Sequence, residues 1–215
     1  MDTSLPPRAA AVLEELLAGN DRYAHDRPSH PHQGRRTRAA LAVGQHPAAA
    51  ILACSDSRVP PTLIFDQGLG DLFIVRNAGQ VLSPDALASL EFAVLELDVP
   101  LIVVLGHQCC GAVRAAAATF GGDDVPEGHL AQVLAPLAPS VAFASRQAGG
   151  DDLEVLSELA GLAHLRLTVK ALRRAGPIIA GRVAEERLGV VGLRYEFSTG
   201  LTSRVDAGAA VGVGA

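Results

Sequence analysis

Tryptophan is absent from this chain of 215 residues, and the aromatic residues together make up only 4% of it. The core must therefore be packed mostly with Ala, Val and Leu, which a hydrophobic content of 49% amply supplies. A surplus of basic residues is also missing, because the formal net charge is −5, and this argues against a nucleic-acid partner. The length suits one domain, or one domain with an appended arm.

Cysteine is scarce as well, with only three residues, at positions 54, 109 and 110. An odd number with two adjacent cysteines does not resemble a disulfide framework, so we expect a reducing, cytoplasmic compartment. A basic segment followed by an apolar one is missing near the N-terminus, so we expect no secretory signal. The densest apolar run, residues 99–106, is far shorter than the ~20 residues of a membrane helix, so we expect no membrane partner.

Apolar runs alternate with helical patterns along the chain, which favours strands covered on both faces in a largely parallel sheet. We therefore expect an α/β fold with a largely parallel central β-sheet flanked by helices, an N-terminal helical arm and a C-terminal edge strand. The predicted strands are residues 48–53, 72–76, 101–105, 189–197 and 201–205. The predicted helices are residues 8–24, 84–97, 111–119, 127–146, 153–174 and 177–187. Pro136 and Pro139 are expected to break or kink the fourth of these helices.

Two short motifs carry the chemistry, Cys54-Ser-Asp-Ser-Arg58 and Gly106-His-Gln-Cys-Cys-Gly111. Each follows a predicted strand, so both should emerge at the edge of the sheet where α/β proteins place their ligand sites. Two thiolates and one imidazole that leave a fourth position open are typical of a catalytic zinc site. The sequence therefore predicts that Cys54, His107 and Cys110 bind zinc.

Asp56 and Arg58 lie two and four residues beyond the first predicted ligand. Two thiolates cancel the zinc charge, so the metal should acidify a bound water less than a site with only histidines would. A carboxylate that accepts a hydrogen bond from this water would compensate, and Asp56 is the candidate. Arg58 can hold Asp56 ionised and oriented through a bidentate pair. We expect these two residues to be catalytic.

The pattern Cys-x-Asp-x-Arg followed by His-x-x-Cys resembles the beta-class carbonic anhydrases, most closely their bacterial branch. The resemblance covers roughly residues 10–205 and includes the runs at 18–23, 65–79 and 192–195. It implies reversible hydration of CO2 to bicarbonate and a proton, with one zinc ion per subunit. It also implies a homodimer or a homotetramer.

The resemblance implies the same roles for the three metal ligands and the two catalytic residues. It further implies a substrate pocket. In that pocket Gln45 matches a glutamine that hydrogen-bonds substrate, while Phe73, Ala78 and Phe92 match positions that line a small apolar CO2 pocket. The family supplies these apolar positions from a neighbouring subunit.

The missing tryptophan bears on a further property of the family. Some bacterial members bind an inhibitory bicarbonate ion with a Trp, an Arg and a Tyr. Here Arg76 matches the arginine, but Ile51 occupies the tryptophan position. We therefore do not expect this form of inhibition.

The composition divides the chain into three parts. Residues 1–47 are predicted to be an N-terminal helix and a polar arm, which has no core of its own and should lie across another surface, such as a partner subunit. Residues 48–206 are the predicted zinc-binding α/β catalytic domain. Residues 207–215, rich in Gly and Ala, are a predicted flexible tail.

Three other functions are compatible with parts of this pattern. A hydrolase of carbonyl sulfide or carbon disulfide could use the same zinc chemistry on the same scaffold. A non-catalytic zinc- or bicarbonate-binding protein would not need the pair of Asp56 and Arg58. A thiol redox protein would use Cys109 and Cys110, but these lack the two-residue spacer of thioredoxin-like motifs. We expect Cys109 to be a packing residue.

Overall fold

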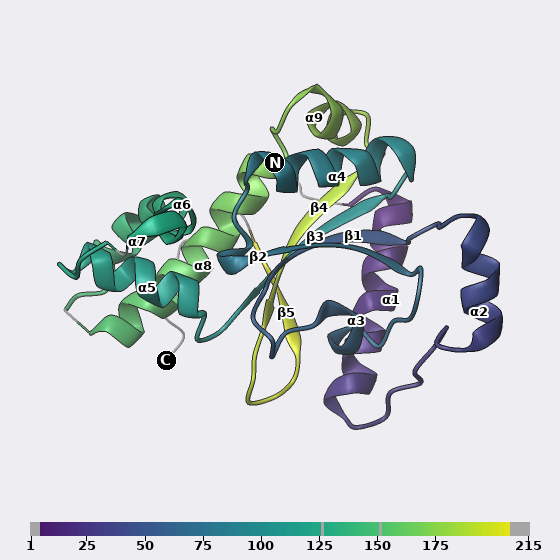
Figure 1. The fold of residues 1–215 in the computed structure, drawn as a ribbon, viewed down its shortest axis with the longest axis horizontal. Helices are drawn as coiled ribbons and strands as arrows, with labels where there is room; N and C mark the ends of the chain where they lie inside the picture. Colours follow the sequence, from purple (N-terminus) through teal and green to yellow (C-terminus); the bar gives the residue numbers. More distant parts are fainter. Residues whose placement is uncertain (1–4, 126, 151, 207–215) are drawn as a thin grey trace.

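The structure is a computed structural model that describes residues 5–125, 127–150 and 152–206, so the predicted tail at 207–215 lies outside the described residues. The described residues form a five-stranded sheet with the strand order β2-β1-β3-β4-β5 (Figure 1). The strands are β1 (Ala49–Cys54), β2 (Leu72–Asn77), β3 (Leu101–His107), β4 (Gly189–Tyr195) and β5 (Thr202–Val205). The first four run parallel and β5 pairs antiparallel with β4. This confirms the predicted α/β fold with a C-terminal edge strand.

The central strands β1 and β3 are buried at every residue, as their continuous apolar runs predict. Successive side chains point to opposite faces of the sheet. In β1, Ile51 and Ala53 pack into one core cluster, whereas Ala50 and Leu52 pack into the other. By contrast, β2 lies at an edge of the sheet and most of its residues are only half-buried.

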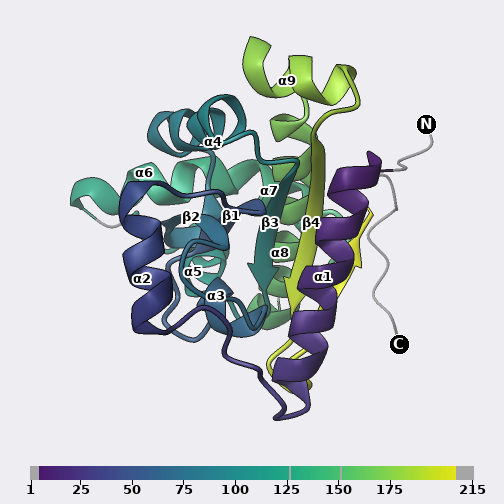
Figure 2. The same cartoon turned by 90° about the vertical axis from the view of Figure 1, so that its right-hand side faces the viewer.

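Helices cover both faces of the sheet. The helix α1 (Pro7–Ala24) packs on one face (Figure 2), whereas α4 (Pro84–Glu96) and α9 (Pro177–Ala184) belong to the core of the other. The long helix α8 (Leu153–Leu172) contributes to both clusters and packs against α5 (Gly111–Phe120). Short helical segments complete the connections: α3 (Pro61–Ile64), η2 (Ala78–Gln80), η3 (Gly128–Leu130), α6 (Ala131–Leu134), η4 (Ala135–Leu137) and α7 (Ala138–Ser145).

One segment differs from the sequence prediction, and a second agrees with it. Residues 25–47, expected to be a polar arm, contain the helix α2 (Arg35–Ala40) and the 3₁₀ turn η1 (Leu41–Val43), neither of which buries a residue. Pro136 and Pro139 were expected to break or kink the segment at 127–146. The structure confirms this, because the segment is divided into α6, η4 and α7. Each proline lies in the first turn of a new helical segment, where a missing backbone N–H costs nothing.

The connection between α1 and α2 is attached to the domain by the carboxylate of Asp66, which is only 3% exposed. Asp66 accepts hydrogen bonds from Arg22 Nε at 2.6 Å, from both the amide and the hydroxyl of Ser29, and from the amide of His30. Burial alone would raise the pKa of Asp66, but the hydrogen bonds from Ser29, Arg22 and His30 outweigh it and hold this pKa well below its usual range.

No helix within residues 5–125, 127–150 and 152–206 is long and apolar enough to cross a membrane.

Candidate metal centre

The two motifs meet at the carboxyl edge of the sheet, as the sequence predicts. Cys54 ends β1 and His107 ends the neighbouring parallel strand β3, while Cys110 is the N-cap residue of α5. The three side chains are buried, and their ligand atoms all lie within 4.8 Å of one another. The positive end of the α5 dipole favours a thiolate at Cys110.

The distances and hydrogen bonds of these side chains fit a zinc ion. The sulfurs of Cys54 and Cys110 are 3.9 Å apart, and two sulfurs bound to one tetrahedral zinc ion lie about 3.8 Å apart. The Nδ1 atom of His107 donates a proton to the carbonyl oxygen of Gln108 at 2.7 Å. This leaves Nε2 with its lone pair, buried and without a hydrogen-bond partner among the described residues. A metal ion would satisfy this atom.

The pKa values of the two thiols are strongly linked. The Cys54 sulfur faces the Cys110 thiol and the amide of Gly79, at 3.9 and 3.4 Å, and these hydrogen bonds lower the pKa of Cys54 despite its burial. The same contact raises the pKa of Cys110, because its proton is held by the Cys54 sulfur. Two thiolates this close repel each other unless a cation balances them. The donor set is therefore built for a positively charged ion.

Asp56 and Arg58 form the predicted bidentate pair. Arg58 donates from Nε to one carboxylate oxygen at 3.0 Å and from Nη2 to the other at 2.8 Å, and its amide adds a third bond at 2.9 Å. The hydrogen bonds from the Arg58 side chain lower the pKa of Asp56 to about 2. The carboxylate is therefore ionised at neutral pH and can accept a further hydrogen bond.

Arg76 holds the loop that carries this pair. It donates from Nε to the carbonyl of Cys54 at 2.9 Å and from Nη2 to the carbonyl of Asp56 at 2.7 Å. Asn77 bonds both backbone groups of Val81 and so closes the neighbouring turn. Both residues order the backbone around the candidate metal ligands.

Sequence reasoning missed two groups that pack around the cluster. The ring of Phe197 lies edge-on to His107, with ring centroids 5.8 Å apart, and the Arg58 guanidinium lies 4.4 Å from the centre of that ring. Phe197 follows β4, so the end-of-strand rule that found the two motifs also applies to it. His164 on α8 is buried and lies 2.9 Å from the carbonyl of Gly79. Burial lowers its pKa, and no local motif marks it in the sequence.

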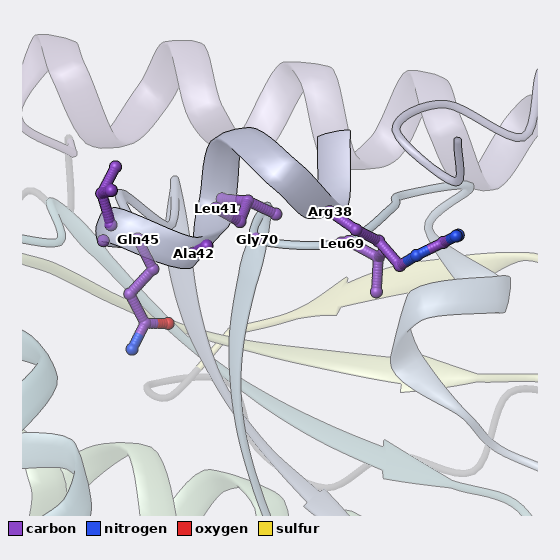
Figure 3. A pocket seen from close by; sticks show the side chains of 8 residues that line it. Arg38, Leu41, Ala42, Gln45, Leu69 and Gly70 are labelled. Atoms are coloured by element: carbon purple, nitrogen blue, oxygen red, sulfur yellow. The ribbon is translucent and has the colours of Figure 1, made fainter. Parts of the chain in front are cut away.

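The residues of the implied substrate pocket are not all brought together in one chain. Gln45 lines a pocket together with Leu41 and Leu69 (Figure 3) and precedes β1 in the chain, whereas Cys54 ends this strand, about 16 Å along it from Ala49. Phe73 pairs in register with Ala50, about 13 Å along β2 from the partner of Cys54.

Phe92 belongs to the same distant group, whereas Ala78 does not. Phe92 stacks on Phe73, with ring centroids 6.1 Å apart, and half of its surface is exposed. Ala78 directly follows Asn77, which is the register partner of Cys54. Of the four implied pocket residues, only Ala78 therefore lies at the metal-ligand edge of its own chain.

Comparisons with known proteins agree with this geometry. The sequence model of a family described as carbonic anhydrase matches residues 49–202. The chain is 44% identical to carbonic anhydrase 2 of Mycobacterium tuberculosis over 190 residues, covering 88% of this chain and 89% of the relative. It is 40% identical to a carbonic anhydrase of Mycolicibacterium smegmatis, covering 88% and 90%.

Solved structures give the same result. The chain resembles a tetrameric beta-carbonic anhydrase of Sordaria macrospora with a TM-score of 0.71 and 30% identity, covering 93% of this chain and 100% of the other. It also resembles the beta-carbonic anhydrase CafA of Aspergillus fumigatus with a TM-score of 0.70 and 33% identity, covering 92% of each chain.

Proposed function

The chain belongs to the carbonic anhydrase family, in its beta class, and from this premise we propose that it catalyses the reversible hydration of CO2 to bicarbonate and a proton. One observation carries the proposal. Two sulfurs 3.9 Å apart face an imidazole nitrogen that has no hydrogen-bond partner among the described residues, and they lie beside a carboxylate that an arginine keeps ionised.

We propose that Cys54, His107 and Cys110 hold one zinc ion per subunit. When bound, zinc would act as a Lewis acid and lower the pKa of a coordinated water toward neutrality. The hydrogen bond from His107 Nδ1 to the carbonyl of Gln108 fixes the ring so that Nε2 remains the ligand atom. The Gly79 amide and the α5 N-terminus stabilise negative charge on the two sulfurs.

Asp56 would act by accepting a hydrogen bond from the reacting water. Its low pKa keeps it an acceptor throughout the neutral range, and the two bonds from Arg58 fix the plane of its carboxylate. A lone pair of the water oxygen then faces the carbon of CO2. Arg58 is in turn held against the ring of Phe197.

We propose that Gln45, Phe73 and Phe92 serve the site of a neighbouring subunit, in a homodimer or a homotetramer. Their distance from Cys54 within one chain supports an arrangement between chains. The described tetrameric assembly of the Sordaria macrospora relatives agrees with it. The arm within residues 1–47 would then lie against the partner, and residues 48–206 would form the catalytic domain. The three free cysteines favour the reducing cytoplasm.

A stopped-flow assay of CO2 hydration on the zinc-loaded protein tests the proposed reaction. We expect turnover far above the uncatalysed rate at pH 8 and above, with one zinc per chain by elemental analysis. Activity at background with zinc bound would contradict the proposal. Sulfide release from carbonyl sulfide and carbon disulfide, measured on the same sample, would show whether such an analogue is the preferred substrate instead.

A further inference from the structure

The turn between two of the candidate ligands has an unusual backbone. Cys109 lies between His107 and Cys110 and adopts φ +49°. This left-handed region is uncommon for any residue other than Gly, and such a conformation persists only where neighbouring groups hold it. The direction in which Cys110 leaves the turn depends on this conformation.

Both peptide groups of Cys109 are held by side chains from elsewhere in the chain. Its amide donates a hydrogen bond to Glu158 Oε1 at 2.7 Å. Its carbonyl accepts one from Arg58 Nη2 at 3.2 Å. The turn is therefore fixed from one side by the α8 helix and from the other by the proposed catalytic arginine.

Glu158 is itself fixed. Its second carboxylate oxygen pairs with Arg194, which lies on β4 opposite Gly106 in the sheet register. Glu158 and Arg194 share with His107 and Cys110 the walls of a cavity of only about 10 Å³. A cavity of that volume holds at most a single water molecule. Glu158 contacts the turn directly, and Arg194 reaches the turn through Glu158.

We propose that Glu158 is a positioning residue of the metal centre. Together with Arg194 it holds the left-handed turn at Cys109, and so sets where the Cys110 sulfur lies relative to Cys54 and His107. Groups that orient metal ligands in this way typically change metal affinity by about 10–100-fold when they are removed. This inference rests on the proposed metal centre and adds to it a residue that is neither a proposed metal ligand nor a proposed catalytic residue.

Glu158→Ala is the test variant, and Glu154→Ala is its matched control. Glu154 lies one turn earlier on α8 and pairs with Arg114 of α5 at 2.7 Å. Its removal therefore deletes a contact between α8 and α5 but leaves the hydrogen bonds of the Cys109 turn intact. We expect Glu158→Ala to raise the rate of zinc loss to a chelator by about 10–100-fold. We expect Glu154→Ala to leave that rate unchanged.

The cobalt-loaded proteins give a second readout that does not depend on activity. The sulfur-to-cobalt charge-transfer bands report the two thiolates directly, so in Glu158→Ala we expect these bands to shift or weaken. Thermal unfolding of the zinc-free proteins shows whether each variant is folded. Glu158→Gln keeps an oxygen that can accept from the Cys109 amide but loses the charge pair with Arg194, so its zinc loss should be intermediate.

Cys109→Gly tests the backbone argument. Glycine adopts positive φ without strain, so the effect of Glu158→Ala should be smaller in a Cys109→Gly background. Zinc loss from Glu158→Ala at the wild-type rate would overturn the inference, as would equal effects of Glu158→Ala and Glu154→Ala. Failure of the wild-type protein to bind zinc would instead contradict the proposed function, so the two failures are distinguishable.

Discussion

The carboxyl edge of the sheet and the edge strand β2 differ in how complete they are within one chain. At the carboxyl edge the candidate ligands are buried, and their loops are held by Arg58, Arg76 and Glu158. Along β2, the stacked rings of Phe73 and Phe92 lie partly exposed, and Gln45 lies on an exposed segment. We propose that a metal ion completes the first region and that the surface of another subunit completes the second.

This difference separates two tasks of the enzyme. The proposed metal binding depends on short hydrogen bonds between loops that follow neighbouring strands, so one chain can supply them all. The proposed CO2 pocket depends on apolar side chains that the described residues of their own chain leave partly exposed. We therefore expect changes at the carboxyl edge to alter the chemistry in each subunit, and changes near β2 to act across subunits.

Asp56→Ala should produce the largest loss at the carboxyl edge that leaves the metal in place. Removing the carboxylate removes the acceptor that orients the water, so CO2 hydration should fall by about 10²–10⁴-fold. Zinc content should remain one per chain, because the three ligands are untouched. Asp98→Ala is a suitable control, since Asp98 pairs with Arg8 away from the candidate ligands. Loss of zinc from Asp56→Ala would mean that Asp56 is a ligand and not a catalyst.

Asp66→Ala should loosen the attachment of the arm and lower the stability of the fold, without changing zinc binding. The change leaves Arg22 and the amides of Ser29 and His30 without their buried acceptor. We expect the free energy of unfolding to fall by about 3 kcal/mol, measured by urea denaturation. Asp21→Ala removes only exposed ion pairs of α1 and should cost less than about 1 kcal/mol. Equal losses in the two variants would show that Asp66 does not anchor the arm.

The smallest expected effect is a shift in the pKa of Asp56 when its partner Arg58 is removed. Its pKa of about 2 lies below the ordinary aspartate value of about 3.9. The ionised group therefore stabilises the folded state above about pH 4, and this contribution is lost as the pH falls toward 2. In a titration followed by the NMR signal of the carboxyl carbon, Asp56 should remain mostly ionised at pH 4. Arg58→Ala should move the midpoint upward, and an unchanged midpoint would mean that Arg58 does not set it.

The sheet and the two motifs could be predicted from the sequence because both depend on local patterns. Buried strands read as continuous apolar runs, and parallel strands bring Cys54 and His107 to one edge whatever the details of packing. The helix α2 could not be predicted, because it buries no residue and so leaves no apolar period.

Contacts between distant segments could not be predicted from the sequence either. Glu158 meets the amide of Cys109, and His164 meets the carbonyl of Gly79, through the way α8 crosses the sheet. No spacing in the sequence encodes either contact. The positive φ of Cys109 could not be predicted either, because cysteine rarely adopts it. The hydrogen bonds to the Cys109 amide and carbonyl explain it, and they come from distant residues.

Mixed dimers test most directly whether each site needs a second chain. A chain with Cys54→Ser, which lacks a metal ligand, is co-expressed with a chain carrying Gln45→Ala, and two different tags select the mixed species. If Gln45 serves the partner's site, this dimer contains one complete site and should show about half of the wild-type CO2 hydration. Each parent homodimer should be far less active, by about 10²-fold or more.

The reverse mixture supplies the control for the same measurement. A chain with both changes is paired with a wild-type chain, so the only metal-competent site faces the Gln45→Ala partner. We predict low activity for this dimer and half activity for the first. Half activity for the reverse mixture and low activity for the first would show that Gln45 acts within its own chain, and would contradict the account.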